Sequence, residues 1–248
     1  MLPDFDVLAV LFIMSAFLRN KLRCRILPGM IEWVVIHGVA ERDAMAKREE
    51  QKAASRQKLL ESAAHCFAKK GFDGCSIADI AAEAEMSQGS VYVHFANKED
   101  LFKCMIQQEH GDAAAIMRRA AAEAPSFQRI MDLLIKCIRD VGFPIDHRLW
   151  VEILAVSARN DSIRMAFLAS DRMMRDAFVE LIRKAAQLGE VDKNLDYEAV
   201  SIWVYALVDG LIARAADDAD FDFDTQIATF DFLVRRALGA PPGGAKRK

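Results

Sequence analysis

The sequence predicts an all-α fold. Apolar residues recur at three- and four-residue intervals over much of the chain, which is the spacing of one face of an α-helix. The 248 residues include only 12 glycines and 6 prolines, which leaves little material for the turns of an all-β protein. A hydrophobic fraction of 53% with 28% charged residues is typical of a globular chain with a core of its own. No motif recurs at a period of about 20 to 50 residues, so the pattern excludes a solenoid.

Charge and cysteine content narrow the class of protein further. The net charge is -3, so attraction to a nucleic acid has to come from a local surface rather than from the whole chain. The five cysteines are an odd number without a C-x-x-C pair, which argues against a disulfide framework and a structural zinc site. We therefore expect reduced intracellular thiols that fill the core, and no metal. The cysteines are Cys24, Cys66, Cys75, Cys104 and Cys137.

The N-terminus carries an apolar run at residues 5–18, which basic residues follow. About 14 residues are fewer than the roughly 20 that span a bilayer, and a signal peptide carries its charges before the apolar run. Three interpretations stay open: residues 1–44 precede the true start, form a peripheral or disordered extension, or anchor a membrane. The charged opening at Met45 favours the first, and we expect no membrane contact.

A first helix is predicted from Ala53 to Gly71, because apolar residues recur there at helical spacing. Gly71 suits a left-handed C-terminal cap. The stripe that we expect to be buried consists of Leu59, Leu60, Ala63, Ala64 and Phe67.

A second, shorter helix is predicted to start at Ser76. The Ser76 hydroxyl can cap it, and Asp79 three residues later completes a capping box. The apolar face of this helix of about two turns consists of Ile77, Ile80, Ala81 and Ala84.

A third short helix is predicted over residues 88–95, with Ser87 as its cap and with Val91 and Phe95 facing inward. Two short helices that lean on a longer one form a helix-turn-helix, whose second short helix enters the major groove of DNA. Its outward side chains suit that role. Gln88 and Ser90 can hydrogen bond to bases, Tyr92 and His94 can reach phosphates, and Val93 can pack on a thymine methyl group.

Cations flank this motif. Asn97 caps a fourth helix, and Lys98 at its start places an ammonium group beside the same groove. The free N–H groups at the helix starts after Ser76 and Ser87 can position phosphates. Between residues 45 and 110, nine Lys or Arg oppose ten Asp or Glu, so the geometry matters more than bulk charge. A basic arm upstream consists of Lys47, Arg48, Lys52 and Arg56.

Three segments keep one spacing across about 45 residues: Leu60-x-x-Ala63-Ala64-x-x-Phe67-x-x-x-Gly71-Phe72, Ser76-Ile77-x-x-Ile80-Ala81, and Met86-Ser87-x-Gly89-Ser90-Val91-Tyr92-x-His94-Phe95-x-Asn97-Lys98-x-x-Leu101. Together they resemble the N-terminal domain of the TetR family of transcriptional regulators. The resemblance adds Gly89 to the residues expected at the DNA. The predicted DNA-binding residues are Arg48, Lys52, Ser76, Ser87, Gln88, Gly89, Ser90, Tyr92, Val93, His94 and Lys98.

Two positions depart from the family pattern. Glu85 stands in the turn where the family usually has glycine, and a positive φ at a residue with a side chain costs about 1 kcal/mol. We expect the Glu85 carboxylate to point to solvent, where it weakens DNA affinity slightly. Cys75 replaces the usual threonine and removes a polar contact at the second helix.

The rest of the chain is predicted to form longer helices separated by Gly, Pro, Asn and Asp residues. The tail at residues 241–248 is rich in Pro and Gly and is expected to be disordered. The predicted helices are 126–141, 145–158, 162–188, 197–216 and 225–238.

The stretch that begins at residues 148–152 and runs through residues 207–211 is similar to the C-terminal domains of BetI-like and AcrR-like family members, which bind a small effector and form the dimer. By this resemblance the last two helices pack against their copies in a four-helix interface. An intramolecular core face is the alternative for the same residues. They are Trp203, Leu207, Leu211, Ile227, Phe230 and Val234.

The candidate effector pocket combines apolar bulk with a few polar atoms. Each of its residues has an alternative explanation in core packing or a surface ion pair, and the sequence does not identify the ligand. Glu152, Arg175 and Asp209 are the candidate polar anchors. The other candidates are Trp150, Phe167, Met173, Phe178, Trp203 and Tyr205.

An enzyme is not expected, because the five histidines are dispersed and no H-E-x-x-H, P-loop or G-x-G-x-x-G motif occurs. We expect four segments: an extension (1–44), a three-helix helix-turn-helix domain (45–110), a helical effector-binding and dimerisation domain (111–240) and a tail (241–248). The expected protein is a cytoplasmic homodimer that binds an inverted repeat in double-stranded DNA without a cofactor. It represses transcription until an unknown small molecule binds; an activator or a membrane-tethered regulator is the alternative.

Overall fold

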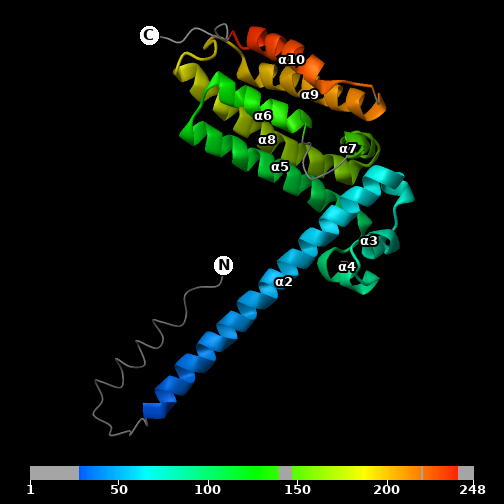
Figure 1. Cartoon of the computed structure of the whole chain (residues 1–248), viewed down its shortest axis with the longest axis vertical. Helices are drawn as coiled ribbons and strands as arrows, with labels where there is room; N and C mark the ends of the chain where they lie inside the picture. Colours follow the sequence, from blue (N-terminus) through cyan, green and yellow to red (C-terminus); the bar gives the residue numbers. More distant parts are fainter. Residues whose placement is uncertain (1–27, 140–146, 219, 240–248) are drawn as a thin grey trace. The chain divides into compact units, whose positions relative to one another are not determined.

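The computed structural model describes residues 28–139, 147–218 and 220–239, with side chains from Met45 onward. In these residues every regular element is a helix (Figure 1), which confirms the all-α prediction. The apolar run at 5–18 and the tail at 241–248 lie outside the described residues. The helices are α2 (Pro28–Gly74), α3 (Ile77–Glu83), α4 (Gln88–His94), α5 (Lys98–Glu123), α6 (Phe127–Arg139), α7 (His147–Arg159), α8 (Asp161–Gln187), α9 (Tyr197–Asp217) and α10 (Phe223–Ala237).

The chain forms two compact units, residues 1–53 and residues 54–248. Helix α2 begins at Pro28, so the predicted start at Ala53 is wrong. The reason is local: residues 45–56 are mostly Ala, Lys, Arg, Glu and Gln, which favour helix without any apolar stripe. The helical φ/ψ values of α2 are interrupted at Gly71, whose φ of 71° confirms the predicted positive φ there.

The predicted caps of the next three helices are confirmed. The Ser76 hydroxyl accepts a hydrogen bond from the Asp79 N–H, and the Asp79 carboxylate accepts one from the Ser76 N–H, which completes the capping box. Ser87 accepts from the N–H of Ser90, and Asn97 from that of Asp100. In the C-terminal half, the predicted end of one helix at 141 and the predicted start of the next at 145 lie outside the described residues, and the other predicted ends agree with the observed ones within two residues.

Helices α5 and α8 pack side by side at the centre of the C-terminal half (Figure 1). Helices α7 and α9 also pack on α8 and on each other, and α10 packs on α6 and α9. Helix α5 runs straight through residues 110 and 111, where the sequence suggested a domain boundary. Helix α5 therefore contributes its first turns to the DNA-reading half and its remainder to the C-terminal half.

Two apolar cores lie in the unit of residues 54–248. One gathers α2, α3, α4 and the start of α5, and includes Leu149 and Ile153 of α7. The other gathers the rest of α5 with α6, α8, α9 and α10. Trp150 packs against both cores. Helix α7 therefore belongs to the interior of both halves.

The expectation of reduced cysteines is wrong for two of the five. Cys66 of α2 and Cys75 are joined by a disulfide, with their Cα atoms 6.0 Å apart. The spacing of nine residues gave no signal, because the pairing depends on the positive φ at Gly71, which turns the chain after α2 back toward Cys66. Cys104 and Cys137 are free thiols, and Cys24 lies outside the described residues.

The predicted dimer face needs a second correction. Phe230 and Val234 of α10 are fully buried in the core of their own chain, so the intramolecular alternative holds for them. Trp203 and Leu207 of α9 are exposed instead. A helix presents residues three to four apart on one side, and α10 turns the side of Phe230 and Val234 inward.

Candidate nucleic-acid interface

Helix α4 separates its buried and exposed side chains as the sequence predicts. Val91 and Phe95 are buried against α2 and α5, with exposed fractions of 0% and 2%. Tyr92 and Val93 are exposed at 57% and 71%. Gln88 and Gly89 are exposed as well. The short helix thus presents a polar and aromatic face outward, and its contact with DNA stays a prediction.

The N-terminus of α4 is organised by two hydroxyl groups. Ser87 accepts a hydrogen bond from the Ser90 N–H at 3.1 Å, and the two hydroxyl oxygens lie 2.8 Å apart. The Ser90 side chain therefore has a structural partner besides any base. The remaining free N–H groups of this turn are oriented to receive an anion.

Gly89 is not required by packing within the chain. A Cβ atom placed on it would lie 3.7 Å from the Ser87 hydroxyl oxygen, an ordinary contact, and its φ is not positive. The contact between Gly89 and DNA stays a prediction.

The turn between α3 and α4 confirms the expectation for Glu85. Its φ is 54°, the only positive φ of a non-glycine residue in the part of the chain that the structure describes. Its side chain is exposed, and the carboxylate lies 3.3 Å from the Lys58 ammonium. Both features follow from glutamate occupying a position at which glycine would be unstrained.

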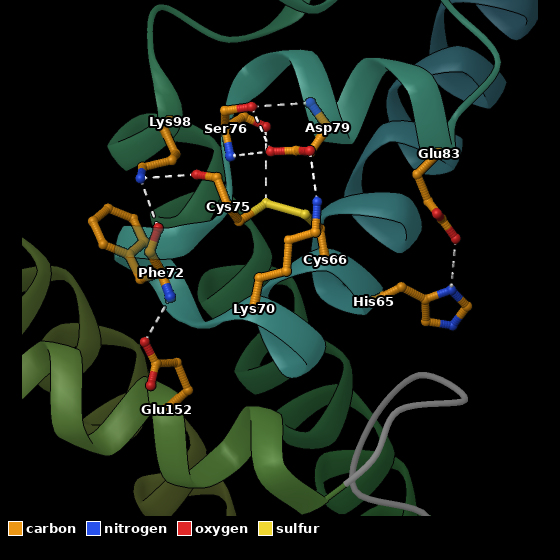
Figure 2. The surroundings of a disulfide bond; sticks show 10 residues. All are labelled: His65, Cys66, Lys70, Phe72, Cys75, Ser76, Asp79, Glu83, Lys98 and Glu152. Carbon is orange, nitrogen blue, oxygen red and sulfur yellow. Dashed lines mark hydrogen bonds and ion pairs between the residues drawn. A yellow bond between two sulfur atoms is a disulfide. The ribbon is translucent and has the colours of Figure 1, made fainter.

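Lys98 occupies the corner between α2 and α3. Figure 2 shows its ammonium group donating to the carbonyl oxygens of Phe72 (2.6 Å) and Cys75 (2.9 Å). The same group lies 4.4 Å from the centre of the Phe72 ring. An ammonium group has three N–H donors, so one is left for a phosphate. Lys98 is thus a structural residue, and its predicted phosphate contact stays a prediction.

A polar network continues from this corner to the start of α3 (Figure 2). The Lys70 ammonium donates to the Asp79 carboxylate at 2.6 Å, and Asp79 also accepts from Ser76. The Lys70 hydrogen bond and then those from Ser76 hold the pKa of Asp79 well below its usual range. The capping residue of α3 is therefore tied to α2.

The basic arm lies partly outside this unit. Lys47, Arg48 and Lys52 are exposed on α2 in the unit of residues 1–53, and their DNA contacts stay predictions. Arg56 belongs to the unit of the helix-turn-helix, where its guanidinium group lies 5.2 Å from the centre of the Phe95 ring. It supports the inward face of α4.

Glu152 connects α7 to the end of α2. Its carboxylate accepts a hydrogen bond of 2.6 Å from the Phe72 N–H, and a Cβ atom at Gly71 would approach the same oxygen to 3.3 Å. An open cavity of about 490 Å³ lies beside this contact, lined by Arg148, Glu152 and Arg214 among others. The Glu152 carboxylate is thus in contact with the DNA-reading half, and its predicted role as an effector anchor stays a prediction.

The interior between α5, α7 and α8 contains a histidine that the sequence analysis did not single out. The buried His110 ring lies 5.2 Å from that of Phe167 and 5.8 Å from that of Trp150, measured between ring centres. His110 Nδ1 lies 2.8 Å from the Ser170 hydroxyl, which also lies 3.1 Å from the carbonyl oxygens of Ala166 and Phe167. His110 Nε2 has no hydrogen-bond partner among the described residues.

The two carbonyl groups at the Ser170 hydroxyl favour one tautomer of His110. A serine hydroxyl has one hydrogen, and if Ser170 donates it to a carbonyl, then Nδ1 must donate to Ser170. His110 Nε2 is then an unprotonated acceptor. Burial lowers the pKa of His110 to about 4, so the ring is neutral at physiological pH.

Carboxyl groups near this interior are also perturbed. Burial, and then the neighbouring Asp112, raises the pKa of Glu109 to about 7. Burial raises the pKa of Asp209, although the Trp150 indole donates to it at 2.9 Å. Arg175 pairs with Asp171 at 2.8 Å. This region therefore holds several polar groups in an apolar surrounding.

The predicted pocket residues do not form one site. Trp150 and Phe167 gather around His110, whereas Phe178 and Tyr205 meet edge to face, with ring centres 5.4 Å apart, in the other core. Met173 is exposed, and Trp203 is 72% exposed. Trp203 and Tyr205 are two residues apart on α9 and so point to nearly opposite sides, which the grouping by residue type overlooked.

Helix α9 is the one described helix whose length and apolar composition would allow it to cross a membrane. A core helix of a globular protein meets the same criteria, and the face of α9 with Val204, Tyr205 and Val208 is buried in the fold. The apolar composition of α9 therefore has two sources: one side packs in the core, and the other side exposes Ile202, Trp203 and Leu207.

The capped tri-helical arrangement with an outward face on α4 defines a helix-turn-helix DNA-binding protein. Comparisons with known proteins agree. Residues 59–105 match the family model for bacterial regulatory proteins of the tetR family, and residues 128–239 match that for the C-terminal part of BetI-type transcriptional repressors. The chain belongs to the TetR family of transcriptional regulators. Members are DNA-binding proteins rather than enzymes, which confirms the expectation of no enzymatic activity.

One relative is the HTH-type transcriptional repressor AcnR of Corynebacterium diphtheriae, 26% identical over 171 residues, which are 67% of this chain and 84% of AcnR. The fold is similar to that of GusR from Salmonella enterica (TM-score 0.63, 23% identity, 75% and 96% of the two chains). It is also similar to FadR of Bacillus subtilis in complex with stearoyl-CoA (TM-score 0.57, 18% identity, 72% and 96%). At these identities the solved structures support the fold alone.

Proposed function

We propose that this chain is a cytoplasmic repressor that binds an inverted repeat in double-stranded DNA as a homodimer and leaves it when a small molecule binds. The observation that carries the proposal is the outward face of α4, with Tyr92 and Val93 exposed over the buried Val91 and Phe95. That division of residues presents the recognition helix to a major groove. The relative AcnR is named as a repressor, which supports the sign of the regulation.

A second copy of the chain is the proposed partner of α9 and α10. Ile202, Trp203 and Leu207 of α9 and Phe232 and Leu233 of α10 are large, apolar and exposed, on two helices that pack side by side (Figure 1). Apolar surface of this kind is stabilised by covering it. A two-fold dimer meets this need and also presents two copies of α4, as an inverted repeat requires.

The effector is proposed to bind beside His110. This interior combines two large aromatic rings with an unsatisfied acceptor, His110 Nε2, which favours a flat molecule that offers an N–H or O–H donor. FadR, a structural neighbour, is in complex with stearoyl-CoA, which supports the proposal that a small molecule binds this fold.

Glu152 is the proposed route from effector to DNA. It follows Trp150 closely on α7, and its carboxylate holds the Phe72 N–H at the end of α2. A shift of α7 on effector binding would move the end of α2 and with it α3 and α4. Two half-sites about 34 Å apart are read only at the right separation, so a small displacement releases the DNA.

The main test is selection of bound genomic fragments by the purified full chain. Enrichment of an inverted repeat that overlaps promoters supports the proposed repressor, and enrichment upstream of promoters supports the activator. Retardation of no double-stranded fragment at low salt contradicts both.

Variants of α4 then place the contact on the selected DNA. Tyr92→Ala is expected to weaken binding on the order of tenfold, equivalent to about 1.4 kcal/mol, without loss of thermal stability. Leu168→Ala, at an exposed apolar residue of α8, is the matched control and should leave binding unchanged. Equal binding by Tyr92→Ala and the unmodified chain would remove α4 from the interface.

The dimer is tested by sedimentation. Trp203→Arg places a charge on the exposed α9 face and should shift the chain from dimer to monomer, whereas Met165→Arg, at another exposed apolar residue, should not. A monomeric unmodified chain, with or without DNA, would contradict the proposed assembly.

The effector site is tested by thermal shift with a panel of phenols and aromatic amines. Compounds that stabilise the unmodified chain should stabilise His110→Phe less, because the acceptor is gone. Equal stabilisation of both proteins would place the effector elsewhere.

A further inference from the structure

The disulfide between Cys66 and Cys75 lies inside the DNA-reading half and has no role in the function proposed above. Both cysteines are buried, with exposed fractions of 7% and 1%. Cys75 directly precedes Ser76, the cap of α3, and its carbonyl oxygen accepts from Lys98 (Figure 2). The bond therefore ties the corner between α2 and α3 to the body of α2.

The proposed cytoplasmic location determines which reductants and oxidants this disulfide meets. Proteins that act on DNA in the cytoplasm meet a reducing environment, in which disulfides are usually transient and serve catalysis or redox sensing. The rest of the chain also fits a thiol-containing protein, since Cys104 and Cys137 are free. A disulfide that closes a short loop beside the recognition motif is thus a candidate for reversible chemistry.

We propose that Cys66 and Cys75 form a redox modification site, oxidised by a peroxide and reduced by a dithiol, whose disulfide form is the one with the higher affinity for DNA. This inference rests on the DNA binding of the helix-turn-helix, and on the proposed cytoplasmic location.

The oxidation proceeds in two balanced steps. The Cys66 thiolate, the more exposed of the two, attacks one oxygen of hydrogen peroxide; a sulfenic acid forms and hydroxide leaves. The Cys75 thiol sulfur then attacks the Cys66 sulfur; the S–S bond forms, the S–O bond of the sulfenic acid breaks, and that oxygen leaves as water with the Cys75 thiol proton. Reduction by a dithiol returns both thiols and converts the reductant to its own disulfide.

Both redox forms find local support in the structure. The Cys75 sulfur lies 3.8 Å from the Ser76 carbonyl oxygen, which can accept the hydrogen of the reduced thiol. His65, which precedes Cys66 in the sequence, does not serve as a base for either thiol. Its Nδ1 atom lies 3.6 Å from the Glu83 carboxylate, and both of these side chains are exposed (Figure 2). Peroxide, about the size of water, is the reactant that suits a nearly buried thiol.

The disulfide form favours DNA binding because the corner that it closes positions α3. Lys98, Ser76, Asp79 and Lys70 form their hydrogen bonds around this corner while the bond is intact. Reduction replaces a covalent bond by a contact between two thiols, which must move apart within a packed interior. The corner then opens more often, and the fraction of chains ready to bind DNA falls.

The chemistry is tested first on the full chain. Non-reducing trypsin digestion after peroxide treatment should yield a linked pair of peptides, residues 59–69 and 71–98, because Lys69 and Lys70 separate the two cysteines. Treatment with dithiothreitol should separate the linked pair into two peptides, and peroxide treatment of the reduced chain should restore the link. A reduced chain that never regains the link, or a link that dithiothreitol does not break in the folded chain, overturns the proposal.

The effect on DNA is tested with the fragment selected above. The oxidised chain should bind at least about threefold more tightly than the reduced chain, because reduction lowers the fraction of molecules in the conformation that binds DNA. Amide exchange at residues 75–80 should accelerate by up to about 100-fold on reduction. This factor is the increase in the opening equilibrium that is expected when a disulfide no longer closes a loop of about ten residues.

Variants assign the effect to this pair. Cys66→Ala with Cys75→Ala should bind DNA equally with and without dithiothreitol, whereas Cys104→Ala, at a free thiol, should keep the full response. If the double variant does not fold, the comparison of oxidised and reduced unmodified chain still decides. Equal affinity in both redox states overturns the redox site and leaves the proposed repressor standing; no binding in either state contradicts the repressor itself.

Discussion

The DNA-reading half and the interior of the C-terminal half treat their polar groups differently. Around the corner of α2 and α3, Lys98, Lys70, Ser76 and Asp79 all have partners at hydrogen-bond distance. In the interior between α5, α7 and α8, His110 has an acceptor without a partner among the described residues, and burial perturbs the pKa of Glu109.

The two halves differ in this way because each has a different proposed task. A motif that has to present one fixed face gains from satisfied hydrogen bonds, which hold the backbone in one arrangement. An interior that has to bind a polar molecule needs polar groups that form their hydrogen bonds only with that molecule. Until it binds, these unsatisfied groups lower the stability of the fold. Substitutions should therefore destabilise the first region and can stabilise the second.

The largest effect is expected at the aromatic cluster under the helix-turn-helix. Phe102 is fully buried, and its ring centre lies 5.0 Å from that of Phe67 and 4.9 Å from that of Phe72. Phe102→Ala should lower the free energy of unfolding by about 3–5 kcal/mol, measured by denaturant titration. Tyr92→Ala, an exposed aromatic of the same half, is the control; similar losses in both variants would deny the cluster its role.

The opposite sign is expected at Glu109. Its pKa is raised in the folded chain, so that state holds a proton that the unfolded state has released, and stability falls as the pH rises from about 4.5 to about 7. Glu109→Gln should therefore remove this fall and stabilise the chain at pH 8 by about 1–3 kcal/mol. Thermal melts from pH 5 to 8 measure it.

Glu123→Gln, at an exposed carboxylate of the same helix, is the control for that series and should leave the pH dependence unchanged. A Glu109→Gln curve parallel to that of the unmodified chain would mean that Glu109 is solvated, and the comparison of the two halves would lose its strongest support.

A loss of about 2 kcal/mol is expected for Lys98→Ala, because two backbone carbonyl groups lose a charged donor. DNA binding should weaken in parallel, since the corner that positions α3 is loosened. Lys69→Ala, at an exposed lysine of α2, should change neither quantity. A Lys98→Ala chain with full stability and weak DNA binding would instead make Lys98 a phosphate contact only.

The smallest effect concerns an exception within the DNA-reading half. Glu85 has a φ of 54°, so Glu85→Gly should relieve strain and raise stability by about 0.5–1 kcal/mol, less the small contribution of the Lys58 ion pair. Glu85→Ala keeps the strained φ and should bring no gain. A gain for alanine equal to that for glycine would show that the carboxylate, not the backbone, is responsible.

The local patterns were predictable because they depend on neighbours in sequence. Ser76, Ser87 and Asn97 cap helices through backbone N–H groups three residues away, and the inward face of α4 follows from the four-residue spacing of Val91 and Phe95. The positive φ at Glu85 was predicted from the family pattern, which usually has glycine in this turn, and the structure confirms it.

The missed residues depend on contacts across the fold. His110 meets Trp150 and Phe167 from 40 and 57 positions further along the chain, and no pattern around His110 marks it. The Cys66–Cys75 bond needed the turn at Gly71, and the inward side of Phe230 and Val234 depends on which face of α10 meets α6 and α9.

Sequence patterns alone predict that the chain is helical, where most of its helices begin and end, and that a helix-turn-helix of the TetR family faces outward at α4, because caps, spacing and propensity act within a few residues. The start of α2 at Pro28 is not among them, since no apolar stripe marks it. Packing of the folded chain sets the rest. Glu152 holds the end of α2, and His110 Nε2 has no partner among the described residues, because side chains from separate helices arrive at one place. The two cysteines meet because the chain turns at Gly71.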